Sequence, residues 1–161
     1  MRALTPIEAA VAVAVAGSVL FAALPAFFKN LHASRMAEPL DGVGAIAARA
    51  TALASGQTPE SAFPDSVGLT PAQVPRAERV VDPPGTWDHP TWQKLGFSQT
   101  VPHCYSFAFE SKNGKGLATF RASANGDLDG DGIHSTFAIR GELRDGAEPK
   151  AQPLEIEREI E

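Results

Sequence analysis

The stretch LTPIEAAVAVAVAGSVLFAALPAFF, residues 4–28, decides how the rest of this 161-residue chain is interpreted. From Ala9 to Phe28 it carries no charged residue, and about twenty residues in an α-helix cover the hydrocarbon core of a bilayer. A cleaved secretory signal has a shorter apolar run followed by a small-residue cleavage site, whereas this run continues to Lys29. The pattern predicts a helix that is long enough to span a membrane.

Glu8 is the one carboxylate in this apolar stretch. An ionisable side chain at the edge of a lipid-facing helix is costly and usually marks a specific partner. Glu8 therefore has two interpretations. It lies in water at the level of the lipid headgroups, or it pairs with a positive charge, because a paired carboxylate in a low dielectric is far less costly than a lone one.

The order of residues in this stretch resembles the N-terminal helix of type IV pilins and of the pseudopilins of type II secretion. The shared pattern is an aliphatic first residue, a Thr, a Glu, a Gly within the apolar run and a Pro-Ala-Phe sequence. The matching positions are Leu4, Thr5, Ile7, Glu8, Gly17, Pro25, Ala26 and Phe27. The resemblance covers about the first thirty residues.

In that family a prepilin peptidase cuts just before the first residue of the motif and methylates the new amine. The resemblance implies that residues 1–3 are a short leader, cut between Ala3 and Leu4, and that Glu8 is an assembly residue that meets the amino group of a neighbouring Leu4. It implies three kinds of partner, namely further copies of this chain, other pilin-like subunits and the peptidase. It also implies a location in the bacterial inner membrane before assembly, with the head in the periplasm, and in a periplasmic or cell-surface filament afterwards.

The chain after the apolar stretch changes character twice. Residues 29–55 continue the predicted helix with an amphipathic pattern, interrupted between Glu38 and Gly42 by Pro39 and Asp41-Gly42, where we expect a kink or a short break. Residues 56–96 form a proline-rich connecting loop, in which a short helix is expected to start at Thr70. Its aromatic and apolar anchors are expected to pin the loop over the sheet: Trp87, Trp92, Leu95 and Phe97.

Residues 97–161 have the alternating, β-branched and aromatic composition of antiparallel strands. The expected strands are Val101–Glu110, Gly116–Ser123 and Ser135–Leu143. An Asn113-Gly114 turn joins the first two. Tyr105, Phe107 and Phe109 share one face, which we expect to meet the helix. The acidic tail after Glu148 is expected to add an edge strand or a short helix.

A loop at residues 125–132, NGDLDGDG, is the second site-like feature. Asp127, Asp129 and Asp131 alternate, so their carboxylates can converge on a hard cation. No helices are expected beside the loop and its twelfth position is Ala138 instead of a bidentate Glu, so the loop is not an EF-hand. We predict a Ca²⁺ site at these three residues, with backbone carbonyls and either Asn125 or Ser135 completing its shell; the alternative is a solvated, glycine-rich hairpin loop.

Composition excludes several other classes of function. The net charge of −5 and the absence of a Lys/Arg cluster argue against nucleic acid as a partner. Cys104 is the only cysteine, so an internal disulfide is impossible, and it is expected to be a small buried residue. No nucleophile motif, phosphate loop or paired-carboxylate cleft is present, and the chain is not expected to be an enzyme.

The expected fold class is α+β, with a long N-terminal helix, half transmembrane (4–28) and half amphipathic (29–55), packed on a small antiparallel β head (97–161), as in pilins. The expected function is that of a structural subunit of a type IV pilus or a related pseudopilus filament. The alternative is a membrane-anchored, calcium-binding extracytoplasmic domain that does not polymerise.

Overall fold

The computed structural model describes residues 5–158, without the side chains of residues 9, 20 and 22–35. Residues 5–158 fall into two compact units that divide between Met36 and Ala37. The second unit holds a six-stranded antiparallel sheet and the last part of the first helix, α1 (Pro6–Ala54). Each unit is described by itself.

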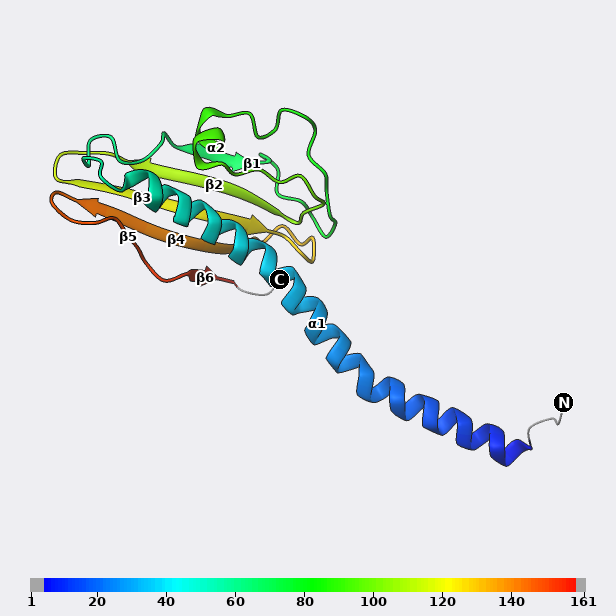
Figure 1. Ribbon diagram of the computed structural model, residues 1–161. Helices are drawn as coiled ribbons and strands as arrows, with labels where there is room; N and C mark the ends of the chain where they lie inside the picture. Colours follow the sequence, from blue (N-terminus) through cyan, green and yellow to red (C-terminus); the bar gives the residue numbers. More distant parts are fainter. Residues whose placement is uncertain (1–4, 159–161) are drawn as a thin grey trace. The chain divides into compact units, whose positions relative to one another are not determined.

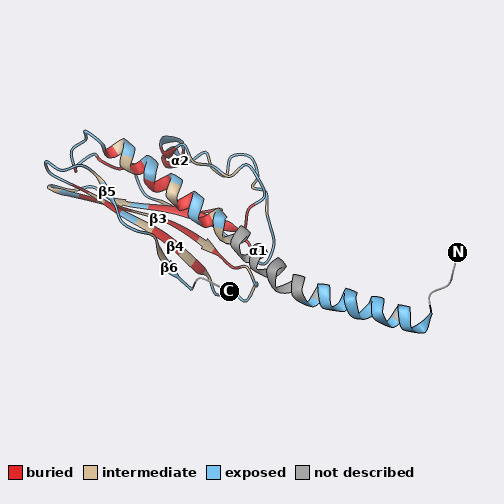
Figure 2. Cartoon of the chain, turned by 60° about the horizontal axis from the view of Figure 1, so that its bottom comes forward, coloured by how far each residue is buried: buried red, intermediate tan, exposed pale blue. Residues whose placement is uncertain are grey.

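The two ends of α1 differ in what surrounds them. Between residues 6 and 19 every described side chain is exposed, although most are apolar. Between residues 36 and 54 the apolar side chains form a buried stripe facing the sheet, and Val43, Ile46 and Ala50 are fully buried. Figure 2 shows the exposed part in pale blue and the buried stripe in red. The second part is packed on the sheet of its own unit.

The predicted fold class is wrong in its helical half. Among the described residues, no helix is both long and apolar enough to cross a membrane. The apolar helical piece with described side chains, residues 6–19, is shorter than the about twenty residues that a bilayer requires. The described structure is instead mostly an antiparallel sheet of six strands, with the helical segment from Met36 to Ala54. An inner-membrane anchor therefore has no support in the described part of the chain.

Of the kink or short break predicted between Glu38 and Gly42, the break does not occur, because α1 runs without interruption from Pro6 to Ala54. Pro39 is fully buried, and the helix continues through it. The Phe107 ring lies so close to Gly42 that a Cβ there would overlap it. Glu38 accepts hydrogen bonds from the backbone N–H groups of Cys104 and Tyr105, at 2.8 and 3.1 Å. Tertiary contacts thus compensate for two residues that disfavour a helix.

The sheet has the order β1-β2-β3-β4-β5, with β6 also pairing with β4. Its strands are β1 (Val67–Thr70), β2 (Tyr105–Lys112), β3 (Leu117–Gly126), β4 (Ser135–Arg144), β5 (Lys150–Ala151) and β6 (Glu155–Glu157). The three central strands are those expected from the alternating pattern, and the acidic tail supplies the edge strand β6. The C-terminal part of α1 lies across one face (Figure 1).

Aromatic rings on that face pack over glycines of the neighbouring strands. The Tyr105 ring covers Gly126, its direct partner on β3, and the Phe120 ring covers Gly141, its direct partner on β4. A side chain at either glycine would overlap the ring, so the missing Cβ atoms make room for the aromatic layer. The expected aromatic face toward the helix is therefore present, and Phe107 contacts α1 directly.

The proline-rich connector carries two short elements. The helix predicted to start at Thr70 is absent, because Thr70 ends strand β1, which pairs with β2. The helix lies later instead, as α2 (Pro90–Leu95), between a His89 N-cap and a left-handed Gly96 C-cap. Proline at the first helical position and glycine just after the last one are favoured at these places.

The aromatic residues of the connector pin it on the sheet, as expected. The Phe97 ring lies 4.9 Å from the Phe107 ring of β2, between centroids, and Trp87 lies 5.5 Å from Phe97. Trp92 is fully buried, and its indole N–H donates to the Thr70 hydroxyl at 2.9 Å. The connector is thus held by aromatic packing and by a buried hydrogen bond.

Candidate functional site

Glu8, the predicted assembly residue, closes a capping box at the start of α1. Its carboxylate oxygen Oε2 accepts hydrogen bonds from the backbone N–H and the hydroxyl of Thr5, both at 2.8 Å. The Glu8 N–H in turn donates to the Thr5 hydroxyl at 3.3 Å. This reciprocal pairing satisfies two N–H groups at the helix end. The Glu8 carboxylate is therefore hydrogen-bonded within one copy of the chain, and its pairing with a neighbouring Leu4 stays a prediction.

The predicted cleavage site between Ala3 and Leu4 lies outside the described residues. The described apolar residues that follow Glu8 present their side chains to solvent. The large ones are Val11, Val13, Val15, Val19 and Phe21. A helix that is apolar on all sides is normally buried in a core, in a membrane or between subunits. Within its own unit, this apolar surface is exposed among the described residues.

The acidic loop brings three of its predicted ligands together. One carboxylate oxygen from each of Asp127, Asp129 and Asp131 lies within 4.8 Å of the others. Asp127 is fully buried, whereas Asp129 and Asp131 are exposed. The fourth predicted ligand, Asn125, donates its side-chain N–H to the hydroxyl of Thr136, its cross-strand partner, at 3.0 Å.

Asp127 already has a cation beside it, the guanidinium of Arg76. Arg76 Nε lies 3.1 Å from Asp127 Oδ2. The same oxygen accepts from the Gly132 N–H at 3.1 Å, and Oδ1 accepts from the Gly130 N–H at 2.8 Å. The connector is fixed here through its backbone as well, because the Ala77 N–H donates to the Asp127 carbonyl at 2.8 Å. Asp127 is thus an anchor between the acidic loop and the connector.

These contacts set the protonation of Asp127. Burial acts to raise the pKa of the Asp127 carboxyl, but the hydrogen bonds from Arg76, Gly130 and Gly132 and the positive charge of Arg76 outweigh it, so the pKa lies below its usual value. Asp127 is therefore a carboxylate at neutral pH. Arg76 places beside Asp127 the positive charge that a metal ion would otherwise supply. Ca²⁺ binding by this loop therefore stays a prediction.

Sequence reasoning missed Arg76 because it lies in the connector, 51 residues before Asp127, and no local pattern links the two. It also missed the buried contacts of Asp82. Asp82 Oδ2 accepts from the Trp87 indole N–H at 2.7 Å and lies 2.9 Å from His103 Nε2. The other ring nitrogen, Nδ1, lies 2.8 Å from the Tyr105 carbonyl. His103 therefore ties the connector to the start of β2.

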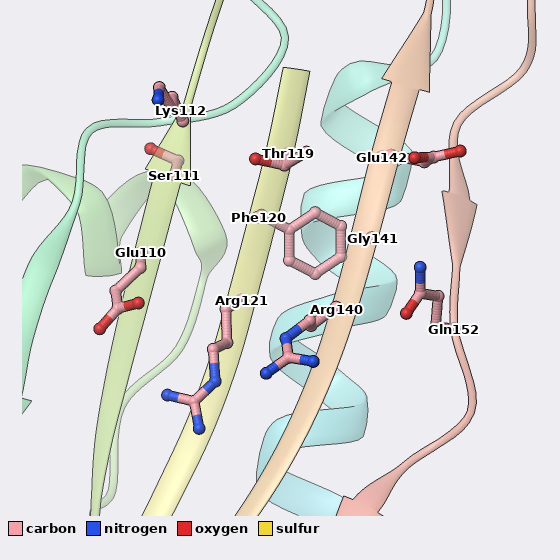
Figure 3. A pocket seen from close by; sticks show the side chains of 10 residues that line it. All are labelled: Glu110, Ser111, Lys112, Thr119, Phe120, Arg121, Arg140, Gly141, Glu142 and Gln152. Atoms are coloured by element: carbon pink, nitrogen blue, oxygen red, sulfur yellow. The ribbon is translucent and has the colours of Figure 1, made fainter. Parts of the chain in front are cut away.

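A shallow groove of about 410 Å³ lies on the sheet face opposite α1 (Figure 3). Arg121 and Arg140 stand directly opposite each other on β3 and β4, and Glu110 stands opposite Arg121 on β2. The groove is open and charged, without an enclosed apolar wall or a nucleophile–base pair. The guanidinium and carboxylate groups that line it could bind a charged group.

Comparison with known proteins finds no matching family model, curated protein or solved structure.

Proposed function

We propose that this chain is a structural subunit of a filament of the type IV pilus or secretion pseudopilus class, assembled through the N-terminal part of α1. The proposal places the apolar helical part inside the filament and the β-sheet unit outside it, in the periplasm or at the cell surface. The sequence resemblance over the first thirty residues supports it. The partners are then further copies of this chain and other pilin-like subunits.

One observation carries the proposal, namely the exposure of the apolar helix between residues 6 and 19. Exposed apolar patches of this extent mark interaction sites, because water contact with apolar surface costs about 25 cal/mol per Å². Val13, Val15 and Val19 are each more than half exposed. Packing against the same helix of other copies would remove this surface from water, and the sheet unit, which has its own core, is free to remain outside.

Glu8 has two separable roles in this proposal. Within one copy it closes the capping box with Thr5. Between copies its charge would pair with the terminal amine of a neighbour, and such a pair fixes the register of the helices. The substitution Glu8→Gln keeps a side chain that can close a capping box but removes the charge. The substitution Thr5→Ala removes the cap but keeps the charge.

The test measures filament protein sheared from the cell surface. We expect Glu8→Gln to remove the protein from the sheared fraction and Thr5→Ala to leave most of it there. Mass spectrometry of the sheared protein should find a methylated Leu4 at the N-terminus. Wild-type protein that never enters the sheared fraction, together with silent Glu8 variants, would reject the filament and favour an anchored, non-polymerising domain.

A further inference from the structure

Arg121 carries an unsatisfied donor in the groove on the outer sheet face. Its Nε is shielded from water and has no hydrogen-bond acceptor. Among the described residues it forms no ion pair, although Glu110 is its direct cross-strand neighbour. A shielded N–H without an acceptor is unfavourable, because the group has lost its hydrogen bond to water without gaining another. The Arg121 guanidinium therefore has no carboxylate partner among the described residues, and because Nε is shielded, an acceptor from another copy would have to meet its terminal N–H groups.

The neighbouring charge of Arg140 makes a negatively charged partner beside Arg121 more favourable. Arg140 stands directly opposite Arg121, and like charges in that position are destabilising. Figure 3 shows the Arg140 guanidinium pointing toward Arg121. Glu155 holds Arg140 at 2.9 Å, and Glu142 is engaged by Arg144 at 2.9 Å, so neither carboxylate pairs with Arg121.

Two adjacent guanidinium groups above an open groove are suited to a carboxylate. The planar fork of an Arg side chain matches the two oxygens of a carboxylate, and such charge-assisted pairs are stronger than neutral hydrogen bonds. An incoming carboxylate would accept from Arg121 and also reduce the repulsion between Arg121 and Arg140. The open shape of the groove fits a side chain presented by another protein surface.

The same sheet offers such carboxylates at its other end. Asp127 is neutralised by Arg76, but Asp129 and Asp131 are exposed and form no ion pair among the described residues. Their loop follows the end of β3, while Arg121 lies in the first half of that strand. The six residues from Arg121 to Asp127 span about 20 Å of extended chain. The groove and the exposed carboxylates therefore lie at different places along the sheet.

We propose that the groove at Arg121 and Arg140 receives the Asp129–Asp131 loop of a neighbouring copy. Because the two complementary surfaces differ, each copy offers both, and the contact is heterologous. Heterologous contacts that do not close into a ring generate open helical assemblies. The inference rests on the proposed filament function and adds a contact between the sheet units to the contact between the helices.

Charge reversal in the full-length chain tests the contact, with the yield of sheared filaments as the readout. Arg121→Glu and Asp131→Arg should each lower the yield at least about tenfold, because each places like charges together at the contact. The double variant Arg121→Glu/Asp131→Arg should recover most of the loss, because the pair is restored with its charges exchanged. Lys94→Glu makes the same charge change on α2, outside the groove, and should keep the wild-type yield.

Each result decides between the proposals. Full filament yield from Arg121→Glu would overturn the groove contact, and so would a double variant whose yield is as low as that of the worse single variant. In either case, filaments formed by the wild type leave the proposed function standing. Absence of wild-type filaments overturns the proposed function and this contact with it. Thermal unfolding of each variant checks that the head is intact; if Arg121→Glu does not fold, the neutral Arg121→Gln should still lower the yield.

Discussion

The two described parts of α1 have similar apolar residues and opposite surroundings. Val13 is 72% exposed and Phe21 is 82% exposed, whereas Val43 and Ile46 are 0% exposed. The later part is stabilised by the sheet of its own unit, and the described side chains of the earlier part are exposed. In the proposed filament, folding and assembly would use different portions of one helix. Substitutions in one part should therefore change stability, and substitutions in the other should change assembly.

Removal of a buried side chain should produce the largest stability effect. Ile46→Ala should lower the free energy of unfolding by about 2–5 kcal/mol, because it leaves a cavity between α1 and the sheet. Val13→Ala, on the exposed part, should change it by less than about 0.5 kcal/mol. Urea unfolding followed by circular dichroism measures both. Equal changes in the free energy of unfolding for the two variants would contradict the distinction between the two parts of α1.

Two of the three glycines of α1, Gly17 and Gly42, sharpen the comparison. A Cβ at Gly42 would overlap the Phe107 ring, while a Cβ at Gly17 would have nothing within 4 Å. Gly42→Ala should therefore destabilise the head by about 1–3 kcal/mol through overpacking. Gly17→Ala should be neutral or slightly stabilising, because alanine favours a helix over glycine by up to about 1 kcal/mol. Thermal unfolding of both variants gives the answer, and a destabilised Gly17→Ala would contradict it.

Acid should weaken the head through Asp127. Because the folded-state pKa of Asp127 lies below its unfolded value, the stabilisation is complete above the unfolded pKa, about 3.9, and is lost as the pH falls through the folded-state pKa. Asp127→Asn should therefore melt below the wild type at neutral pH, and the difference in Tm should shrink below about pH 4. A difference in Tm between the wild type and Asp127→Asn that stays the same from neutral pH to about pH 3 would contradict this role of Asp127.

The smallest expected effect is that of Ca²⁺ on the Tm of the wild type. If Arg76 takes the place of a cation beside Asp127, saturating Ca²⁺ should raise the Tm of Arg76→Ala more than that of the wild type, by mass action on the folded state. Arg79→Ala, which removes a neighbouring guanidinium 3.7 Å from Glu38, is the matched control. A Ca²⁺ shift that is as large in the wild type as in Arg76→Ala would show that Arg76 does not substitute for a cation.

The sheet was predictable from local patterns, and its connections to the rest of the chain were not. Asn113-Gly114 and the alternation along residues 105–110 locate β2 and the hairpin to β3, because turn chemistry and side-chain period are local. The capping box was also present in the sequence as Thr5-Pro6-Ile7-Glu8, since a Thr three residues before a Glu is its signature.

Other features depended on contacts that no local pattern contains. Pro39 and Gly42 predict a break, but the sheet packs against them and the helix continues. The ion pair between Arg76 and Asp127 joins residues that are 51 positions apart. The length of the apolar run alone predicts a membrane span, yet the described part of the chain contains no helix that could form one.

The most direct test of the central claim places a charge on the exposed part of α1. Val13→Asp should remove the protein from sheared filaments without changing the Tm of the head, because the proposal assigns the exposed Val13 to assembly and the core does not include it. Val81→Asp, at a similarly exposed valine of the connector, should leave filaments intact. Wild-type amounts of Val13→Asp in the sheared fraction would contradict assembly through this helix.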